Sequence, residues 1–264
     1  MDTTNVNAIL DAVIRAEREA AELIMHAGSI IAEDKSGHRD VVTEYDRKVQ
    51  LLMEKRIREA MPEATFFCEE MNERDDLHAE NVFIIDPIDG TMNFVKGFNH
   101  SCISAAYASR GTVLAAAVYN PYVDELFTAV KGAGAFLNGH PIRVEEAPLS
   151  ECIVCCGTAP YVPELTERSF DIMCRCCKAG LDIRREGSAE LDLCSVAAGR
   201  AGLFVELSLS LWDYAAGMLI VSEAGGICLT EDGGELPFIG EKTAIAAGGR
   251  RAVSDYLNFV RPKA

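Results

Sequence analysis

The sequence of 264 residues lacks any long apolar run that is free of charges. A helix that crosses a membrane needs about 20 such residues in succession, and no segment approaches that length. The opening segment MDTTNVNAILDAVIRAEREA also lacks a basic stretch followed by an apolar core, which is the pattern of a secretory signal. We therefore expect a soluble, cytoplasmic protein without a membrane partner.

Basic residues are scarce relative to acidic ones, with 25 Lys and Arg against 41 Asp and Glu and a formal net charge of -16. Such a charge repels nucleic acid and anionic lipid at long range, so we expect no nucleic-acid partner. A phosphorylated small molecule can still bind if cations inside the site cancel the local charge.

Internal repeats and low-complexity linkers are also absent, while 49% of the residues are hydrophobic. A chain of this length can bury one large core or two modest ones. Near Ser150 the pattern changes from successive strand-like segments to alternating strands and helices. We predict a boundary between Arg143 and Ser150, with an N-terminal α+β part at residues 1–146 and a C-terminal α/β part at residues 147–264.

Apolar periodicity predicts two amphipathic helices near the start of the chain, at residues 5–32 and 44–60, with Thr43 as the cap of the second. The polar segment EDKSGHRD between them is predicted to be a turn. Strand-like runs follow at TFF, VFIID, CISAAYAS, TVLAAAVY and ELFTAV, and the glycine-rich KGAGAFLNGHP is predicted to be a turn. Farther on, CIVCCG, LDIRRE, LFVEL and ICLT are predicted strands, and PELTERSFDIMCRCCKAG, SAELDLCSVAAGRAG and WDYAAGMLIVSEAGG are predicted helices.

The ten cysteines include two clusters that each contain a C-x-x-C spacing, at residues 152–156 and 174–177. A zinc or redox site could use such spacings. Without a secretory signal, however, the thiols are expected to be reduced, and free cysteine is a common small core residue. Since the two clusters lie on different predicted elements, we favour packing over metal binding.

The segment IIDPIDGTMNF places Asp86 and Asp89 on a tight turn at the end of an apolar strand. Two converging carboxylates repel each other unless a cation lies between them, and Mg²⁺ prefers hard oxygen ligands on such a turn. Gly90 allows the chain to turn sharply, and a helix that starts after Thr91 would point its amides at the same place. An Asx turn, in which both aspartates only bind local amides, explains the pair alone equally well.

Two further segments favour the metal interpretation. FFCEEMNE places Glu69 and Glu70 directly after another apolar strand, and LSLWDYAAG places Asp213 at the start of a helix. Taken singly, paired glutamates indicate a solvated face and a first-turn aspartate serves the helix dipole. Together they supply the four or five carboxylates that two or three divalent ions need.

DPIDGTMNFVKG and WDYAAGMLIVSEAGG resemble the two signature motifs of the inositol monophosphatase family, which contains Mg²⁺-dependent, lithium-sensitive phosphatases. The resemblance extends over nearly the whole chain, including KSGHRDVVTEYDRKVQ, CEE, KGAGAFLNG and GSAELDLC. It implies an α+β fold, the layered α-β-α-β-α sandwich of the inositol monophosphatase and fructose-1,6-bisphosphatase type. Cys68 and Glu190 depart from the family pattern, at positions where glycine and a small residue are usual.

The resemblance implies a set of metal ligands in this sequence. Glu69, Asp86 and the carbonyl oxygen of Ile88 would hold one Mg²⁺. Asp86, Asp89 and Asp213 would hold a second, and a third, looser ion would lie near Glu69.

The resemblance also implies a nucleophilic water that is oriented by Thr91 with Asp46 behind it. Asp46 has a competing explanation as a first-turn acid beneath Thr43. The amides of Gly90 and Thr91 would bind the phosphate. Lys35 matches a family lysine on a mobile loop, although a lone lysine in a polar turn is usually solvent-facing. The remaining implied substrate contacts are Gly187, Ser188, Ala189, Glu206, Asp89 and Asp213.

Three of these substrate contacts have structural explanations as well. Glu206 could accept hydrogen bonds from neighbouring hydroxyls of a polyol, or it could be a charge that protects an edge strand. Gly187 and Ser188 would equally serve as a turn and a helix cap.

We therefore expect a Mg²⁺-dependent phosphatase with two to three ions per site, acting on small phosphate monoesters and foremost on myo-inositol 1-phosphate. Fructose 1,6-bisphosphate, histidinol phosphate and 3'-phosphoadenosine 5'-phosphate are the alternative substrates. A metal-binding or thiol redox-sensing protein without catalysis is the alternative of another class. A homodimer is the family expectation.

Overall fold

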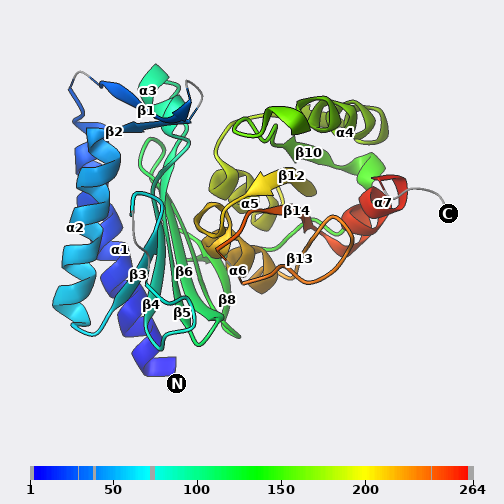
Figure 1. Cartoon of the computed structure of the whole chain (residues 1–264). Coiled ribbons are helices and arrows are strands. Elements are labelled where there is room, and N and C mark those ends of the chain that lie inside the picture. Colours follow the sequence, from blue (N-terminus) through cyan, green and yellow to red (C-terminus); the bar gives the residue numbers. More distant parts are fainter. Residues whose placement is uncertain (1–2, 29, 38–39, 72–74, 239, 261–264) are drawn as a thin grey trace.

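The structure is a computed structural model that describes residues 3–28, 30–37, 40–71, 75–238 and 240–260. Its elements form five layers, in which two sheets alternate with three layers of helices (Figure 1). This arrangement confirms the α+β fold class and the α-β-α-β-α sandwich. Among the described residues, no helix combines the length and the apolar character that a membrane span requires.

The larger sheet has seven strands in the order β3-β4-β5-β6-β7-β8-β9. Its first pair is parallel and every later pair is antiparallel. The strands are β3 (Thr65–Cys68), β4 (Val82–Asp89), β5 (Cys102–Ser109), β6 (Thr112–Asn120), β7 (Glu125–Val130), β8 (Gly134–Leu137) and β9 (His140–Pro141).

Helices α1 (Thr3–Met25) and α2 (Glu44–Ala60) cover one face of this sheet (Figure 1). Both bury an apolar stripe against it, as their periodicity predicts. The predicted start and end of α2 are confirmed, and Thr43 caps it by accepting from the backbone N–H groups of Tyr45 and Asp46. The prediction that α1 reaches residue 32 is wrong, because Gly28 leaves the helix and donates its N–H to the Tyr45 hydroxyl at 2.9 Å.

The smaller sheet has five strands in the order β11-β10-β12-β14-β13. Helices α4 (Thr166–Ala179) and α7 (Arg250–Val260) pack on its outer face, where they enclose a core of their own. The strands are β10 (Ile153–Cys156), β11 (Asp182–Arg184), β12 (Leu203–Leu209), β13 (Ile227–Leu229) and β14 (Thr243–Gly248). Three one-turn helices flank these elements: η1 (Leu149–Glu151), η2 (Pro163–Leu165) and η3 (Leu211–Asp213).

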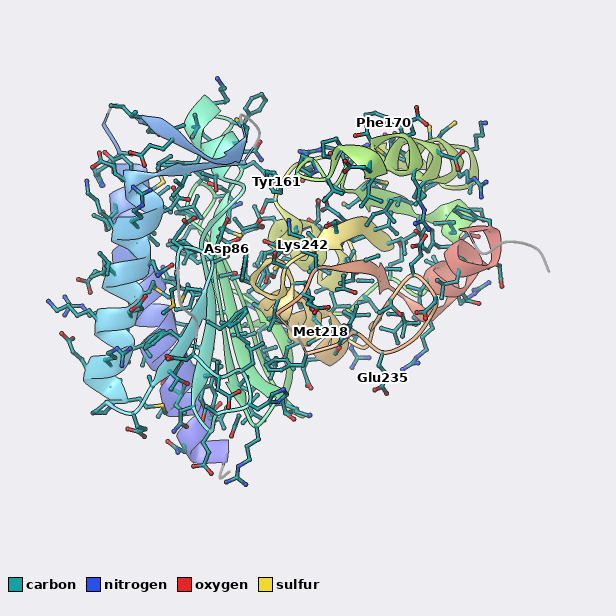
Figure 2. All side chains as sticks on the ribbon, viewed as in Figure 1. Asp86, Tyr161, Phe170, Met218, Glu235 and Lys242 are labelled. Atoms are coloured by element: carbon teal, nitrogen blue, oxygen red, sulfur yellow. The ribbon has the colours of Figure 1, made fainter. Side chains whose placement is uncertain are left out.

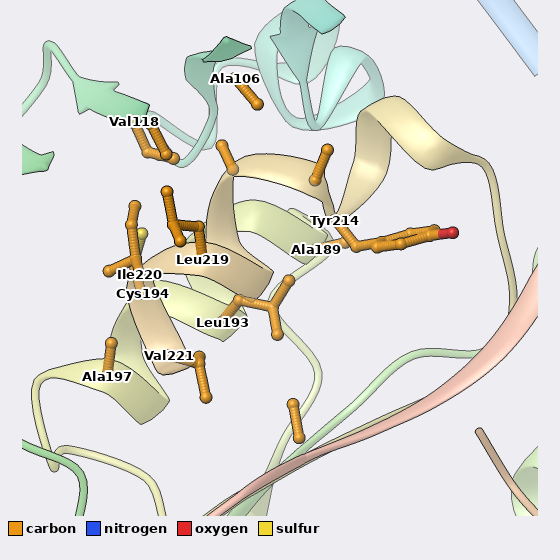
Figure 3. Close-up of a cluster of buried hydrophobic side chains, with 14 of the residues drawn as sticks. Ala106, Val118, Ala189, Leu193, Cys194, Ala197, Tyr214, Leu219, Ile220 and Val221 are labelled. Atoms are coloured by element: carbon orange, nitrogen blue, oxygen red, sulfur yellow. The ribbon is translucent and has the colours of Figure 1, made fainter. Parts of the chain in front are cut away.

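Helices α5 (Ala189–Ala197) and α6 (Ala215–Glu223) form the middle layer between the two sheets. Eight of the nine residues of α5 and six of the nine residues of α6 are buried, so neither helix has the broad polar face of a surface helix. Figure 3 shows side chains such as Leu193, Leu219 and Ile220 packed together in this layer. Since one core joins residues of both sheets, the division at residues 146 and 147 remains a proposal about organisation.

Two predicted turns contain strands instead. The polar segment after α1 forms the antiparallel pair of β1 (Ala32–Gly37) and β2 (Asp40–Thr43). The glycine-rich segment contains β8 and β9, which continue the larger sheet. In both places, pairing with a neighbouring strand overrides a local composition that is typical of turns.

Most of the clustered cysteines are packing residues. Cys152, Cys155, Cys156 and Cys176 are buried in the core around the smaller sheet, whereas Cys174 and Cys177 are exposed on α4. Within the described part of the chain, no group of three His, Cys, Asp or Glu side chains is arranged to hold a metal ion.

Glu17 on α1 is fully buried, and neither of its carboxyl oxygens has a hydrogen-bond partner among the described residues. Burial raises the pKa of Glu17 well above its usual range, and the charge of Glu190 raises it further. A buried polar group without a partner costs free energy of folding. The structure identifies Glu17 as a destabilising residue of this core.

We expect Glu17→Met to raise the free energy of unfolding by about 1–3 kcal/mol, because methionine removes the unpartnered oxygens at similar size. Because the pKa of Glu17 is higher in the folded than in the unfolded protein, its destabilising effect grows as the pH rises above the unfolded-state pKa. The gain should therefore be larger at pH 8 than at pH 5 in urea unfolding. Glu22→Met, on the exposed face of the same helix, is the control. A Glu17→Met variant no more stable than the wild type at either pH would contradict this interpretation.

Candidate metal and phosphate site

Both aspartates of the DPIDGT segment lie at the end of β4, a strand whose eight residues are all buried. The register between β4 and β5 shifts between Asp86 and Asp89, because Asp86 pairs with Ser104 and Asp89 pairs with Cys102. This bulge accommodates Pro87, which has no N–H for a regular ladder. The bulge thereby places two carboxylates at one point of the sheet.

Gly90 makes the turn between β4 and the short helix α3 (Thr91–Lys96). Its φ of 87° lies in the left-handed region that favours glycine, and a Cβ atom there would lie 3.1 Å from the carbonyl oxygens of both Gly187 and His100. The turn therefore requires glycine for its conformation and for its close approach to the C-terminal part of the chain.

Asp89 links β4 to the N-terminus of α5. Oδ2 of Asp89 accepts from the Ser188 hydroxyl at 2.6 Å and from the Glu190 N–H at 2.8 Å, and Oδ1 lies 3.3 Å from the Ala189 nitrogen. Ser188 is also the N-cap of α5, as its structural explanation predicted. Asp86 makes a local bond, with the Ile88 N–H 3.0 Å from its Oδ1, so the Asx-turn explanation holds for Asp86 and not for Asp89.

Thr91 and Asp46 are brought together across 45 residues of sequence. The Thr91 hydroxyl lies 3.3 Å from Oδ1 of Asp46 and 3.1 Å from the carbonyl oxygen of Ile88. Oδ2 of Asp46 accepts from both the N–H and the hydroxyl of Thr43, at 2.8 Å and 2.5 Å. Asp46 thus completes the cap of α2 and faces Thr91 at the same time. Both predicted contacts of Asp46, with Thr43 in the first turn and with Thr91, are therefore present.

Two other predicted carboxylates reach the same place from different elements. Glu69 follows β3, and its N–H donates to the carbonyl oxygen of Ile85 on β4. Asp213 ends η3 and accepts from the Ser210 N–H at 2.6 Å, directly before α6 begins.

Mutual repulsion marks these carboxylates as one group. Burial raises the pKa of Asp86 well above its usual range, and neighbouring negative charges raise it further; these come from Glu69, Asp89, Asp213 and Asp46. The pKa of Asp213 is raised by burial and then by Glu69 and Asp89. For Asp89, burial raises the pKa, while the hydrogen bonds from Ser188 and α5 oppose the rise. A bound cation would relieve this repulsion.

The donor set fits a magnesium ion by its chemistry. It consists of carboxylate and carbonyl oxygens, and Mg²⁺ commonly uses one or two carboxylates and completes its shell with water and phosphate. Among the described residues no three such side chains are arranged to hold an ion together, so a bound ion would draw these carboxylates closer to one another. Oxygens of Asp86, Asp89 and Asp213 already accept protein hydrogen bonds, and a carboxylate retains further lone pairs for an ion.

One cavity of about 730 Å³ collects nearly all of the predicted site residues. Those that line it are Glu69, Asp86, Ile88, Asp89, Gly90, Thr91, Gly187, Ser188, Ala189, Glu206 and Asp213. Asp46 is fully buried behind Thr91 and does not line the cavity. The side chain of Lys35 lies outside the described part of the structure.

Glu206 lies on β12, a central strand of the smaller sheet, so the edge-strand explanation is wrong. Its Oε1 accepts from the Ala159 N–H at 2.9 Å, and the close approach of its carboxyl group to Gly157 leaves no room for a Cβ there. Burial raises the pKa of Glu206 to about 7.

Several residues of the site were missed from the sequence. Asn93 holds two loops together, with its Nδ2 donating to the carbonyl oxygens of His100 and Glu186 at 2.8 Å and 2.7 Å. Arg185 and Lys242 also line the cavity. They lie in polar segments without a recognisable motif, where a cation is usually solvent-facing.

Glu190 was noted only as a departure from the family pattern. It is fully buried, and its two carboxyl oxygens accept from the N–H groups of Ala216 and Gly217 at 3.2 Å and 2.6 Å. It therefore caps α6, the helix that follows Asp213. A charged residue inside the apolar helix SAELDLCSVAAGRAG was the available signal, because buried charges need a partner.

The chain matches the family model described as "Inositol monophosphatase family" over residues 5–260. It is 35% identical over 260 residues to Nus factor SuhB of Escherichia coli (strain K12), with 97% of each chain covered. The solved structure of extragenic suppressor protein suhB from Bartonella henselae is similar, with a TM-score of 0.89 and 32% identity over 97% of this chain and 100% of that chain. An IMPase structure from Thermotoga maritima is similar as well, with a TM-score of 0.85 and 33% identity over 98% of this chain and 97% of that chain. The chain belongs to the inositol monophosphatase family.

Proposed function

We propose that the chain is a Mg²⁺-dependent phosphatase of small phosphate monoesters, with myo-inositol 1-phosphate as the leading substrate. The observation that carries this proposal is the gathering of four mutually repelling carboxylates beside the Thr91–Asp46 pair in one cavity. Family membership supports the phosphatase chemistry.

In this proposal, Glu69, Asp86 and the carbonyl oxygen of Ile88 hold one ion. Asp86, Asp89 and Asp213 hold a second, and a third lies near Glu69. When bound, Mg²⁺ lowers the pKa of a water molecule and cancels charge on the phosphate. The site needs no covalent intermediate with the protein.

The side chains of the protein position the reactants. Thr91 shares its single hydroxyl proton between Asp46 and the carbonyl oxygen of Ile88, so its lone pairs can accept a hydrogen bond from the attacking water and orient it. The amides of Gly90 and Thr91 are proposed to bind the phosphate, and Ser188, Ala189 and Glu206 to contact the alcohol. Phosphoryl transfer depends mainly on such positioning and on charge cancellation.

The names of the relatives do not select a substrate. The E. coli protein is named a Nus factor, and that name states no phosphate ester. The predictions of a homodimer and of no nucleic-acid partner remain predictions, the second resting on the net charge of -16.

Phosphate release from a panel of esters tests the function. The panel contains inositol 1-phosphate, fructose 1,6-bisphosphate, histidinol phosphate and 3'-phosphoadenosine 5'-phosphate, each with Mg²⁺, with chelator and with added Li⁺. We expect release that requires Mg²⁺ and is fastest for inositol 1-phosphate among the monophosphates. No release from any ester would contradict the proposal.

The raised pKa of Glu206 predicts a pH dependence of substrate binding. Above about pH 7 the ionised carboxylate can accept hydrogen bonds from two hydroxyls, whereas below it the neutral acid accepts less well. We expect the KM for inositol 1-phosphate to fall as the pH rises from 6 to 8. The ratio of this KM to that of Glu206→Gln, measured at each pH, cancels the titration of the phosphate itself. A ratio that does not change with pH would refute a role for Glu206 in binding the alcohol.

A further inference from the structure

The cavity of this acidic protein contains two cations that form no ion pair with a carboxylate of the described residues, although the charge of Arg185 opposes the rise in the pKa of Glu206. Arg185 and Lys242 both line it, and neither forms an ion pair with an acidic side chain of the described residues. Elsewhere, exposed arginines such as Arg56 and Arg175 are paired with nearby carboxylates. In a chain with a net charge of -16, two such cations in one cavity indicate an anionic ligand.

Arg185 is held in place on one wall of the cavity. Its Nη2 donates to the Thr158 hydroxyl at 3.2 Å, and its guanidinium group occupies the space that a side chain at Gly187 would need. The planar guanidinium group retains further N–H donors in a geometry that matches phosphate or carboxylate oxygens. Arg185 thus lies beside the segment that carries Gly187 and Ser188.

Lys242 lies with Tyr161, which is 49% exposed. The Nζ atom of Lys242 is 5.5 Å from the centroid of the Tyr161 ring. Both residues line the same cavity as Asp86, and Figure 2 shows them on the side of the smaller sheet, whereas Asp86 lies on the side of the larger one. The ring holds the ammonium group near the cavity without neutralising its charge.

We propose that Arg185 and Lys242, with Tyr161 beside Lys242, form a second anion-binding subsite, and that the cavity favours phosphate esters that carry another anionic group. This inference rests on the proposed function, because the first phosphate is taken to bind at the carboxylate end. The hydroxyl groups of a neutral polyol give these cations only weaker hydrogen-bond acceptors, whereas a second phosphate or a carboxylate also gives them a negative charge. The subsite therefore selects within the class of small phosphate esters.

The test compares inositol 1-phosphate with inositol 1,4-bisphosphate, two probes that differ by one phosphate. Isothermal titration calorimetry with Mg²⁺ present and with the non-hydrolysable phosphonate analogues of both probes measures their affinities without turnover, because the ions that cancel the carboxylate charge remain bound. We expect the wild type to bind the bisphosphate at least about tenfold more tightly. The double variant Arg185→Gln/Lys242→Gln should reduce that preference to about twofold or less, because both charges are removed.

Arg175→Gln/Lys178→Gln is the matched control, since it removes two exposed cations of α4 that do not line the cavity. It should leave the preference unchanged, which excludes a general effect of net charge. Equal affinity of the wild type for both probes, or a preference that survives in the double variant, would overturn the subsite.

Phosphate release with Mg²⁺ separates this inference from the proposed function. A preference in binding together with a kcat/KM for the bisphosphate about tenfold higher supports both. A preference in binding without release of phosphate from either probe supports the subsite and refutes the phosphatase. Release from both probes without any preference in binding supports the phosphatase and refutes the subsite.

Discussion

Asp89→Asn is expected to abolish Mg²⁺-dependent phosphate release, with kcat/KM falling by at least about a thousandfold. Bound metal ions contribute several kcal/mol to catalysis of this kind, and each 1.36 kcal/mol corresponds to about a tenfold change in rate. The substitution removes the charge of a proposed ligand without changing its volume. Steady-state kinetics with inositol 1-phosphate over a range of Mg²⁺ concentrations measures the loss.

The fold should survive this substitution. The amide oxygen of asparagine can still accept from Ser188 and Glu190, while its NH₂ group faces the Ala189 N–H. We expect the free energy of unfolding to fall by only about 1 kcal/mol, with an unchanged circular dichroism spectrum. Asp171→Asn, which changes an exposed aspartate on α4, is the control for charge and should retain full activity. Near-normal activity of the Asp89→Asn variant would refute the assignment of Asp89 as a metal ligand.

Glu190→Ala is expected to have the largest effect on stability. It leaves the buried N–H groups of Ala216 and Gly217 without an acceptor, and each such group costs about 1–3 kcal/mol. It also opens space against Gly217, where a Cβ atom would lie 2.6 Å from Oε2 of Glu190. We expect the free energy of unfolding to fall by about 2–5 kcal/mol in urea denaturation.

The same substitution should also weaken Mg²⁺ activation, because Glu190 connects the two proposed metal-binding segments. Its N–H donates to Asp89, and its carboxylate holds the first turn of α6 directly after Asp213. Glu190→Gln keeps one accepting oxygen and should lose about half as much stability. If the Glu190→Ala variant needed the same Mg²⁺ concentration for half-maximal activity as the wild type, Glu190 would be a structural residue only.

The sequence predicted the fold best where the signal is local. Helix α2 follows from an apolar stripe, a capping threonine and a proline just past its end, and all three features act within the segment itself. The pair β1 and β2 could not be predicted in this way, because AEDKSG has no alternation of apolar and polar residues. It is a strand only because DVVT pairs with it, which is a tertiary effect.

In the candidate site as well, features that lie within one segment were predicted from the local pattern, whereas features that depend on contacts between distant segments were not. Asp86 and Asp89 were found because they share one short segment with a proline and a glycine. The contact between Thr91 and Asp46 joins two elements and came from the family resemblance, since no local pattern carries it. Glu190 and Arg185 were not recognised because their roles depend on α6 and on Thr158, which lie far from them in the sequence.

Anomalous diffraction from crystals of the wild-type protein grown with Mn²⁺ and phosphate tests whether the carboxylates of Asp86, Asp89 and Asp213 bind divalent metal ions. We expect peaks at about 2 Å from oxygens of these carboxylates, with phosphate beside the Gly90–Thr91 turn. Peaks that lie elsewhere, for example on the cysteines of α4, or no peak at these carboxylates at saturating Mn²⁺, would contradict the assignment of these metal ligands.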